Sequence, residues 1–305
     1  GNGQDVWATE RDAGETGAWY PPPPVWSELQ MVAETALPLK ALAVVAGDGE
    51  TVHAFWNETG GTAIAYAVWN GQNWSRAVPL FEGETAVEAL SVAAESNGRL
   101  LMAWSRSDGA LWFSRAQAER ATIGSEWSEP ARLPAASGAY ASQPALAVYE
   151  QAGRIYVAYT IPLNEERGIY LTMSEDGGES WDEAATVFDA ESAGWERVED
   201  PRLALAGESE LHAIFERASL SGSGPVALHY TRSTDGGATW SEPEGMENGT
   251  PQRETVVWSD LVVTAGRLVH VAWQEADGER LNLWHKVSTD NGLSWSRAAR
   301  IGGFG

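Results

Sequence analysis

Pairs of short apolar runs recur along most of the chain, and each pair is joined by a turn that contains glycine or other turn residues. The pairs occupy residues 41–45 and 52–56, 89–93 and 100–104, 145–149 and 155–159, 202–206 and 211–215, and 260–264 and 269–273. Runs of this length bounded by turns predict β-strands, and no stretch has a sustained helical period with caps. Apolar residues follow one another instead of alternating with polar ones, which predicts strands buried on both faces.

A tryptophan followed by serine or aspartate marks a longer period around these pairs. It occurs at Trp26, Trp74, Trp127, Trp181, Trp240 and Trp295, with gaps of 48, 53, 54, 59 and 55 residues. This spacing is typical of one four-stranded blade of a β-propeller. A β-sandwich does not repeat its sequence in this way, and the coil of a β-helix is much shorter. The pattern predicts an all-β, six-bladed β-propeller.

The terminal blade is expected to be incomplete or split, because six such tryptophans accompany only five pairs of inner strands. Residues 1–36 are expected to supply two outer strands of that blade, near residues 6–9 and 25–31. We expect one domain over residues 1–305, with complete blades over residues 37–82, 83–135, 136–190, 191–247 and 248–305. Five complete blades and an outer remnant would result if the chain is a fragment or if its closure is irregular.

A string of the form Ser-x-Asp-x-Gly-x-Ser/Thr-Trp occurs at residues 174–181, 233–240 and 288–295. We interpret it as the turn between the third and fourth strands of a blade. The aspartate accepts backbone N–H groups, the glycine has a positive φ, the Ser/Thr hydroxyl ties the turn to its neighbour, and the tryptophan fills space between strands. A catalytic carboxylate is not expected at three equivalent positions. The residues interpreted as structural are Asp176, Gly178, Trp181, Asp235, Gly237, Trp240, Asp290, Gly292 and Trp295.

These strings resemble the Asp-box, or BNR, repeats of the sialidase superfamily. The resemblance implies a sialidase-like propeller whose boxes lie on the outer rim, opposite the ligand face. Sialidases also carry an Arg-Ile-Pro motif and a tyrosine nucleophile in the last blade. This chain has no Arg-Ile-Pro and no tyrosine after Tyr230, and its nearest matching fragment is Glu216-Arg217. The resemblance therefore implies the fold more directly than the activity.

Candidate site residues lie in the loops that join second to third strands and fourth to first strands, which share one face of a propeller. Arginines and tryptophans there suit a sugar, by hydrogen bonding and stacking. The ligand-binding candidates are Arg106, Arg167, Trp195, Arg202, Arg217 and Trp258. If the protein is an enzyme, the catalytic candidates are Glu216, Arg217, Arg202 and Asp200. His53, His212 and His270 recur at one position in three blades, which predicts separate packing roles and no metal centre.

The composition excludes several classes of function. The formal net charge is −23, which disfavours a nucleic-acid partner. The chain has no cysteine, and no apolar run approaches the length of a membrane span. No cofactor is expected, with Ca²⁺ bound by clustered carboxylates as the alternative.

These observations favour a non-catalytic binding or scaffold propeller, secreted or at the cell surface, whose partner is a carbohydrate or a protein. A sialidase-like exo-glycosidase acting on acidic sugars is the second hypothesis. The third hypothesis is an architectural subunit of a surface assembly, in which an open blade docks a neighbour by strand addition.

Overall fold

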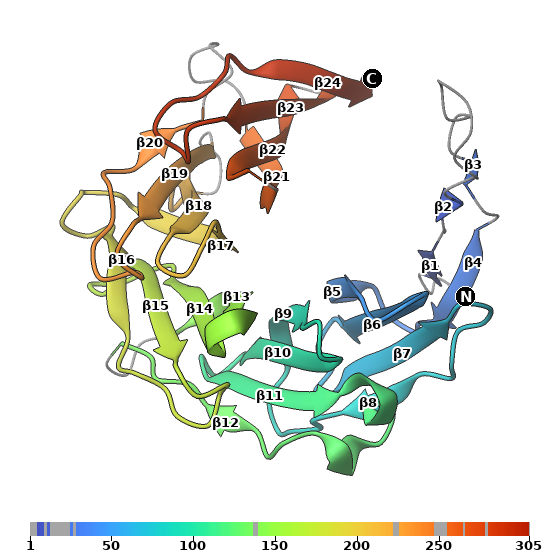
Figure 1. Cartoon of the computed structure of the whole chain (residues 1–305). Helices are drawn as coiled ribbons and strands as arrows, with labels where there is room; N and C mark the ends of the chain where they lie inside the picture. The colour runs from blue at the N-terminus through green and yellow to red at the C-terminus, as the bar shows by residue number, and fades with distance from the viewer. Residues whose placement is uncertain are drawn as a thin grey trace.

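Five four-stranded antiparallel sheets follow one another around an open arc in the computed structural model (Figure 1). The structure describes residues 5–8, 11–12, 25–26, 29–136, 140–221, 226–246, 255–264, 266–277 and 280–304. Each sheet is a meander of four consecutive strands, so the chain completes one blade before it starts the next. None of the described helices is long and apolar enough to cross a membrane.

The strands of the first three blades are short and joined by tight turns. The first blade contains β5 (Leu39–Ala46), β6 (Thr51–Glu58), β7 (Ile64–Asn70) and β8 (Val78–Leu80). The second contains β9 (Val87–Ala94), β10 (Arg99–Arg106), β11 (Leu111–Gln117) and β12 (Ala131–Arg132), with the 3-10 turns η1 (Ala118–Arg120) and η2 (Gly124–Glu126) before β12. The third contains β13 (Ser142–Tyr149), η3 (Glu150–Ala152), β14 (Arg154–Ile161), β15 (Gly168–Ser174) and β16 (Ala185–Asp189).

The last two blades have the same order. The fourth contains β17 (Arg197–Leu205), β18 (Leu211–Ala218), β19 (Ala227–Ser233) and β20 (Glu244–Gly245). The fifth contains β21 (Thr255–Thr264), β22 (Leu268–Asp277), β23 (Arg280–Ser288) and β24 (Ala299–Phe304). The first strands of neighbouring blades contact one another from β5 to β21, which makes them the inner strands of the arc.

The hydrophobic core lies between the blades, as strands buried on both faces require. Phe55 of the first blade packs with Met102 and Trp104 of the second. The remaining interfaces repeat this arrangement, and Trp104 and Trp273 are almost fully buried. The position of each blade is therefore fixed by apolar contacts with the blades beside it.

The expectation of six blades is wrong, because the described strands form five four-stranded blades. Trp26, the first of the six tryptophans, lies in β3 (Val25–Trp26), which pairs with β2 (Arg11–Asp12). β1 (Asp5–Ala8) pairs with β4 (Gln30–Glu34), whose Val32 and Ala33 pack on the first blade. The tryptophan pattern indicates a fourth strand and not a whole blade. Counting these tryptophans therefore overestimates the number of complete four-stranded sheets.

At each end of the arc, the first strand of the terminal blade exposes apolar side chains, which a neighbouring blade would cover. Leu42 and Val44 of β5 are 51% and 55% exposed, and Val262 of β21 is 52% exposed. The arc formed by the described strands does not close into a ring (Figure 1).

Candidate functional site

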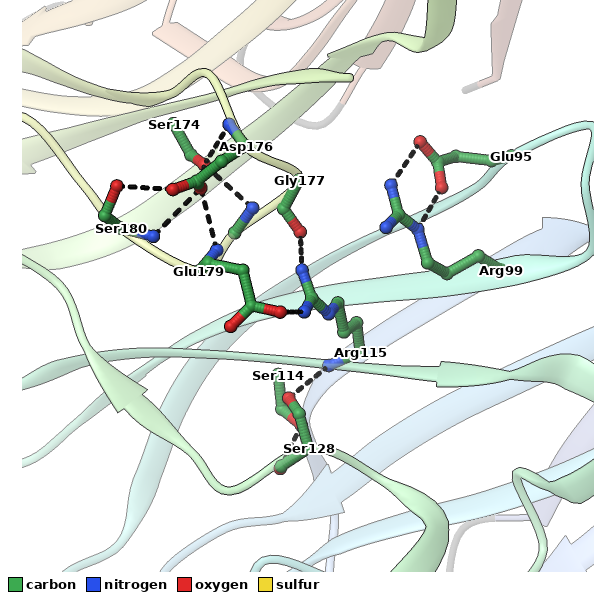
Figure 2. Close-up of polar contacts among 11 residues, drawn as sticks. Glu95, Arg99, Ser114, Arg115, Ser128, Ser174, Asp176, Gly177, Glu179 and Ser180 are labelled. Atoms are coloured by element: carbon green, nitrogen blue, oxygen red, sulfur yellow. Dashed lines mark hydrogen bonds and ion pairs between the residues drawn. The ribbon is translucent and has the colours of Figure 1, made fainter.

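The Asp-box of the third blade is a turn whose polar groups bind one another (Figure 2). Asp176 Oδ1 accepts hydrogen bonds from the backbone N–H groups of Glu179 and Ser180, each at 2.9 Å. The hydroxyl of Ser180 donates to Asp176 Oδ2 at 2.5 Å, and Ser174 Oγ accepts from Gly178 N at 2.7 Å. These hydrogen bonds hold the pKa of Asp176 below its usual range. The carboxylate is fully used by its own turn.

The other two boxes repeat this geometry. The hydroxyl of Thr239 donates to Asp235, and that of Ser294 donates to Asp290. These bonds lower the pKa of each aspartate to about 2. The hydroxyl that was expected to tie the turn to its neighbour donates instead to the aspartate of its own turn.

Contacts between blades come from the glycine and the tryptophan of each box. Gly178 and Gly237 have φ values of +92° and +94°, and a Cβ at either would overlap a side chain of the third strand of the preceding blade. Trp181 lies edge-on to Phe113 of the second blade, with 4.9 Å between ring centroids. Arg115 of β11 also binds the carbonyl of Gly177 and the carboxylate of Glu179 (Figure 2). The boxes therefore join blades at the rim.

The strands of the fourth blade carry a carboxyl cluster at the end opposite the Asp-box, which we define as Glu199 and Asp200 of β17 and Glu216 of β18. Glu199 in β17 is directly opposite Glu216 in β18. Glu216 is 5% exposed, and the hydroxyl of Ser259 in the fifth blade donates to its Oε1 at 3.2 Å. Burial, followed by the charge of Asp200, raises the pKa of Glu216 to about 8. Glu216 is thus a neutral acid at neutral pH.

Two arginines accompany the cluster. Arg197 forms an ion pair with Glu199, with 2.5 Å between Nη2 and Oε2. Burial nevertheless raises the pKa of Glu199, and the charge of Arg197 opposes that shift. Arg202 donates to the carbonyl of Pro201 at 3.1 Å, and its charge partly offsets the rise in the pKa of Glu216.

In the first and third blades, the residue equivalent to Glu216 links its blade to the next one. In the first blade, Asn57 Nδ2 donates to the carbonyl of Val87 in the second blade at 2.8 Å. In the third blade, Thr160 Oγ1 donates to the carbonyl of Val198 in the fourth at 2.9 Å. Both residues are buried and neutral. The fourth blade puts a carboxyl group at this equivalent position.

Asp200 is held by Gln143 of the third blade. Gln143 Nε2 donates to Asp200 Oδ1 at 2.8 Å, and Asp200 N donates to Gln143 Oε1 at 3.0 Å. Both residues have positive φ, +51° for Gln143 and +50° for Asp200, and each precedes a proline at a bulge in its strand. This conformation is uncommon outside glycine, and strained residues of this kind concentrate at functional sites.

An aromatic–arginine cluster, defined as Trp195, Arg217 and His229, lies at the same end of the fourth blade. The guanidinium of Arg217 is 4.9 Å from the centroid of the Trp195 ring, a cation–π distance. Trp195 and His229 are 4.5 Å apart by ring centroids, and burial lowers the pKa of His229 to about 4. Arg167 Nε donates to the carbonyl of Trp195 at 2.6 Å, which fixes the backbone beneath the ring.

The structure separates the predicted site residues into groups. Asp200, Arg202 and Glu216 lie together, and Trp195, Arg167 and Arg217 form a second group. Arg106 binds backbone carbonyls between the first and second blades. Trp258 is 47% exposed on β21. The arginines therefore do not converge on one point.

The three recurrent histidines also occupy separate places. His53 bonds Tyr66 at 2.8 Å and His212 bonds Tyr230 at 2.6 Å, each within its own blade. His270 bonds His285 at 3.0 Å in the fifth blade. Over the described part of the chain, no group of three or more His, Cys, Asp or Glu residues is arranged to hold a metal ion.

Sequence reasoning did not select Gln143, Ser259 or His229. One signal could have found the first two: Gln143-Pro144 and Asp200-Pro201 stand at the same position, near the start of their strands, and Ser259 is at a similar position in the next blade. His229 lacks such a signal, because its place beside Trp195 depends on how two loops pack.

The chain matches the model of the BNR repeat-like domain family over residues 57–302. It therefore belongs to this family and is a BNR-repeat β-propeller. No curated protein matches the sequence significantly.

Solved structures with a similar fold act on carbohydrates in several ways. An ulvan lyase has a TM-score of 0.56 at 14% identity, covering 86% of this chain and 70% of that one. A Hadza microbial sialidase has a TM-score of 0.55 at 15% identity, covering 87% and 58%. An alpha-L-arabinanase from Penicillium chrysogenum, complexed with arabinobiose, has a TM-score of 0.51 at 16% identity, covering 70% and 65%. At these identities the similarity shows the fold alone.

Proposed function

We propose that this chain binds carbohydrate at the loop face of its fourth blade and catalyses no reaction there. The observation that carries the proposal is the buried carboxyl of Glu216, at a position where the first and third blades have Asn57 and Thr160. Those neutral side chains only link their blade to the next. In the fourth blade the same position lies beside two more carboxyls and two arginines. Convergent polar groups of this kind suit sugar hydroxyls.

The aromatic–arginine cluster supplies the second half of the proposed site. An indole ring offers an apolar surface for a sugar ring, and a guanidinium suits the carboxylate of an acidic sugar. The named saccharides of similar structures support this ligand class: the ulvan lyase is bound to a saccharide that contains GlcA, and the arabinanase holds arabinobiose. A secreted or cell-surface location is part of the same proposal, because polysaccharides of this kind occur outside cells.

A glycan array followed by titration calorimetry tests the proposal. We expect Trp195→Ala to weaken binding of the selected glycan at least tenfold, about 1.4 kcal/mol, because the stacking surface is lost. Leu293→Ala is the matched control: this exposed side chain lies on the Asp-box turn of the fifth blade, at the other end of the blades. Trp258→Ala tests the remaining sequence-predicted tryptophan. Equal affinity of wild type and Trp195→Ala would contradict the proposal.

A sialidase-like exo-glycosidase is the second candidate, and the protonation of Glu216 favours it. A carboxyl that keeps its proton at neutral pH is suited to act as a general acid. The separation of the arginines favours binding alone, because a sialidase-type site needs them on one carboxylate. Turnover of a fluorogenic sialoside that is abolished by Arg217→Ala would replace the binding proposal with this enzyme.

A further inference from the structure

A cavity lies at the same end of the blades, between the first and second blades. Its volume is about 370 Å³, within the range of small-ligand sites. The loop between β8 and β9 forms one wall, and the ends of β10 and β11 form the other. Neither the carboxyl cluster nor the aromatic–arginine cluster contributes to it.

Arg106 shapes this cavity without offering it a free charge. Its guanidinium donates to the carbonyls of Phe81 at 2.5 Å, Thr85 at 2.6 Å and Thr62 at 3.2 Å. A Cβ on Gly83 would lie 2.6 Å from Nη1 of Arg106, so the loop passes directly over the guanidinium. The loop is therefore pinned to the blade, and the cavity is preformed.

Aromatic side chains form the walls. Phe81 stacks on Trp104 with 4.6 Å between ring centroids, and Phe81 has a φ of +52°, a strained value for this residue. Trp104 and Trp112 both line the cavity, and their buried indole N–H groups lack an acceptor within the described ranges.

The charge of the lining is strongly one-sided. Four carboxylates surround the cavity, and Arg106, its single lining cation, is occupied by backbone carbonyls. The carboxylates are those of Glu82, Glu84, Asp108 and Glu129. They are not arranged as a metal-binding group. Such a lining attracts a cation and repels an anion, and aromatic walls add cation–π attraction.

We propose that the cavity lined by Trp104 and Trp112 binds a small polyol that carries a protonated amine, such as a hexosamine unit. The apolar face of the sugar ring lies against the Trp112 indole, and the ammonium lies among the rim carboxylates. The site is independent of the fourth-blade site, and its ligand differs in charge from an acidic sugar.

Titration calorimetry with four sugars tests this inference at mildly acidic pH: glucosamine, N-acetylglucosamine, glucose and glucuronate. We expect glucosamine to bind at least tenfold more tightly than glucose and N-acetylglucosamine, and any glucuronate binding to be lost in Trp195→Ala, because an acidic sugar belongs to the fourth-blade site. Added salt should weaken glucosamine binding, because the rim carboxylates are open to solvent. Equal binding of glucosamine and N-acetylglucosamine, or no binding of glucosamine, would overturn the inference.

Variants locate the site. Trp112→Ala should reduce glucosamine affinity at least tenfold, and Glu129→Gln, an exposed change that leaves the fold intact, should reduce it severalfold. Trp195→Ala should leave glucosamine affinity unchanged, which separates this site from the fourth-blade site. The indole N–H resonances of Trp104 and Trp112 should move during the titration. Glucosamine binding that is unaffected by Trp112→Ala and Glu129→Gln would contradict the assignment of the site to this cavity.

Discussion

The third and fourth blades have the same four strands and the same Asp-box turn at one end, yet they differ at the other end. The turns share the serine–aspartate and glycine–serine hydrogen bonds, which join Ser174 to Asp176 and Gly178, and Ser233 to Asp235 and Gly237. At the loop end, the third blade has a buried threonine bound to a backbone carbonyl, and the fourth has the buried carboxyl of Glu216. Repetition in this protein marks the parts that hold blades together.

The departure from the repeat marks the place where chemistry differs. The threonine hydroxyl donates to one carbonyl and carries no charge. A buried carboxyl must be kept neutral or be paired, and here burial and a neighbouring aspartate keep the proton on. A buried carboxyl of this kind lowers the stability of the folded protein at neutral pH. The proposed function explains why the fourth blade has one at this position.

The largest expected effect concerns the Asp-box end, where the third and fourth blades are alike. Gly237→Ala should destabilise the protein by about 2–5 kcal/mol, because a left-handed backbone and overlap with Leu171 both penalise the new Cβ. Gly236→Ala is the control: its φ is +76°, but nothing lies within 4 Å of the new Cβ, so about 1–2 kcal/mol is expected. Urea unfolding measures both.

The same substitution in the third blade, Gly178→Ala, should cost a similar amount, because Phe113 stands where Leu171 stands in the next interface. A much smaller loss in one of the two blades would break the equivalence of the boxes.

The second effect concerns the end at which the blades differ. The unfolded chain releases the Glu216 proton near pH 4.5, whereas the folded protein holds it to about pH 8. The folded state therefore binds more protons between these values, so its stability should fall as the pH rises through this window. The expected loss is about 2–4 kcal/mol, measured by urea unfolding across a pH series.

Glu216→Gln should remove this slope and leave a more stable protein at pH 8, since a neutral amide can still accept from Ser259. An unchanged slope in the variant would mean that Glu216 is ionised in the folded state.

The smallest effect comes from the corresponding residue of the third blade. Thr160→Val removes the hydrogen bond to the Val198 carbonyl and should cost about 1 kcal/mol. The loss should be the same across the pH series, because no ionisable group is involved. A pH-dependent loss in Thr160→Val would show that the two positions share one electrostatic environment, and the contrast between the blades would then fail.

Five of the strand pairs could be predicted from the sequence, because apolar runs and turn residues act locally. Residues 52–56, for example, lie within β6, and residues 211–215 lie within β18. The number of blades could not be predicted, since Trp26 matches the fourth-strand pattern and yet belongs to a short pairing of β2 with β3. A single residue can indicate one strand, whereas a blade forms only when four strands pair.

The sequence by itself determined the repeat, the all-β class and the Asp-box turns, because each depends on residues that are neighbours along the chain. The tertiary structure alone decided the composition of the candidate site. Gln143 reaches Asp200 across 57 positions, and Ser259 reaches Glu216 across 43. Whether a carboxyl is ionised or neutral depends on its burial and on the charges beside it. Both are set only when one blade packs against the next.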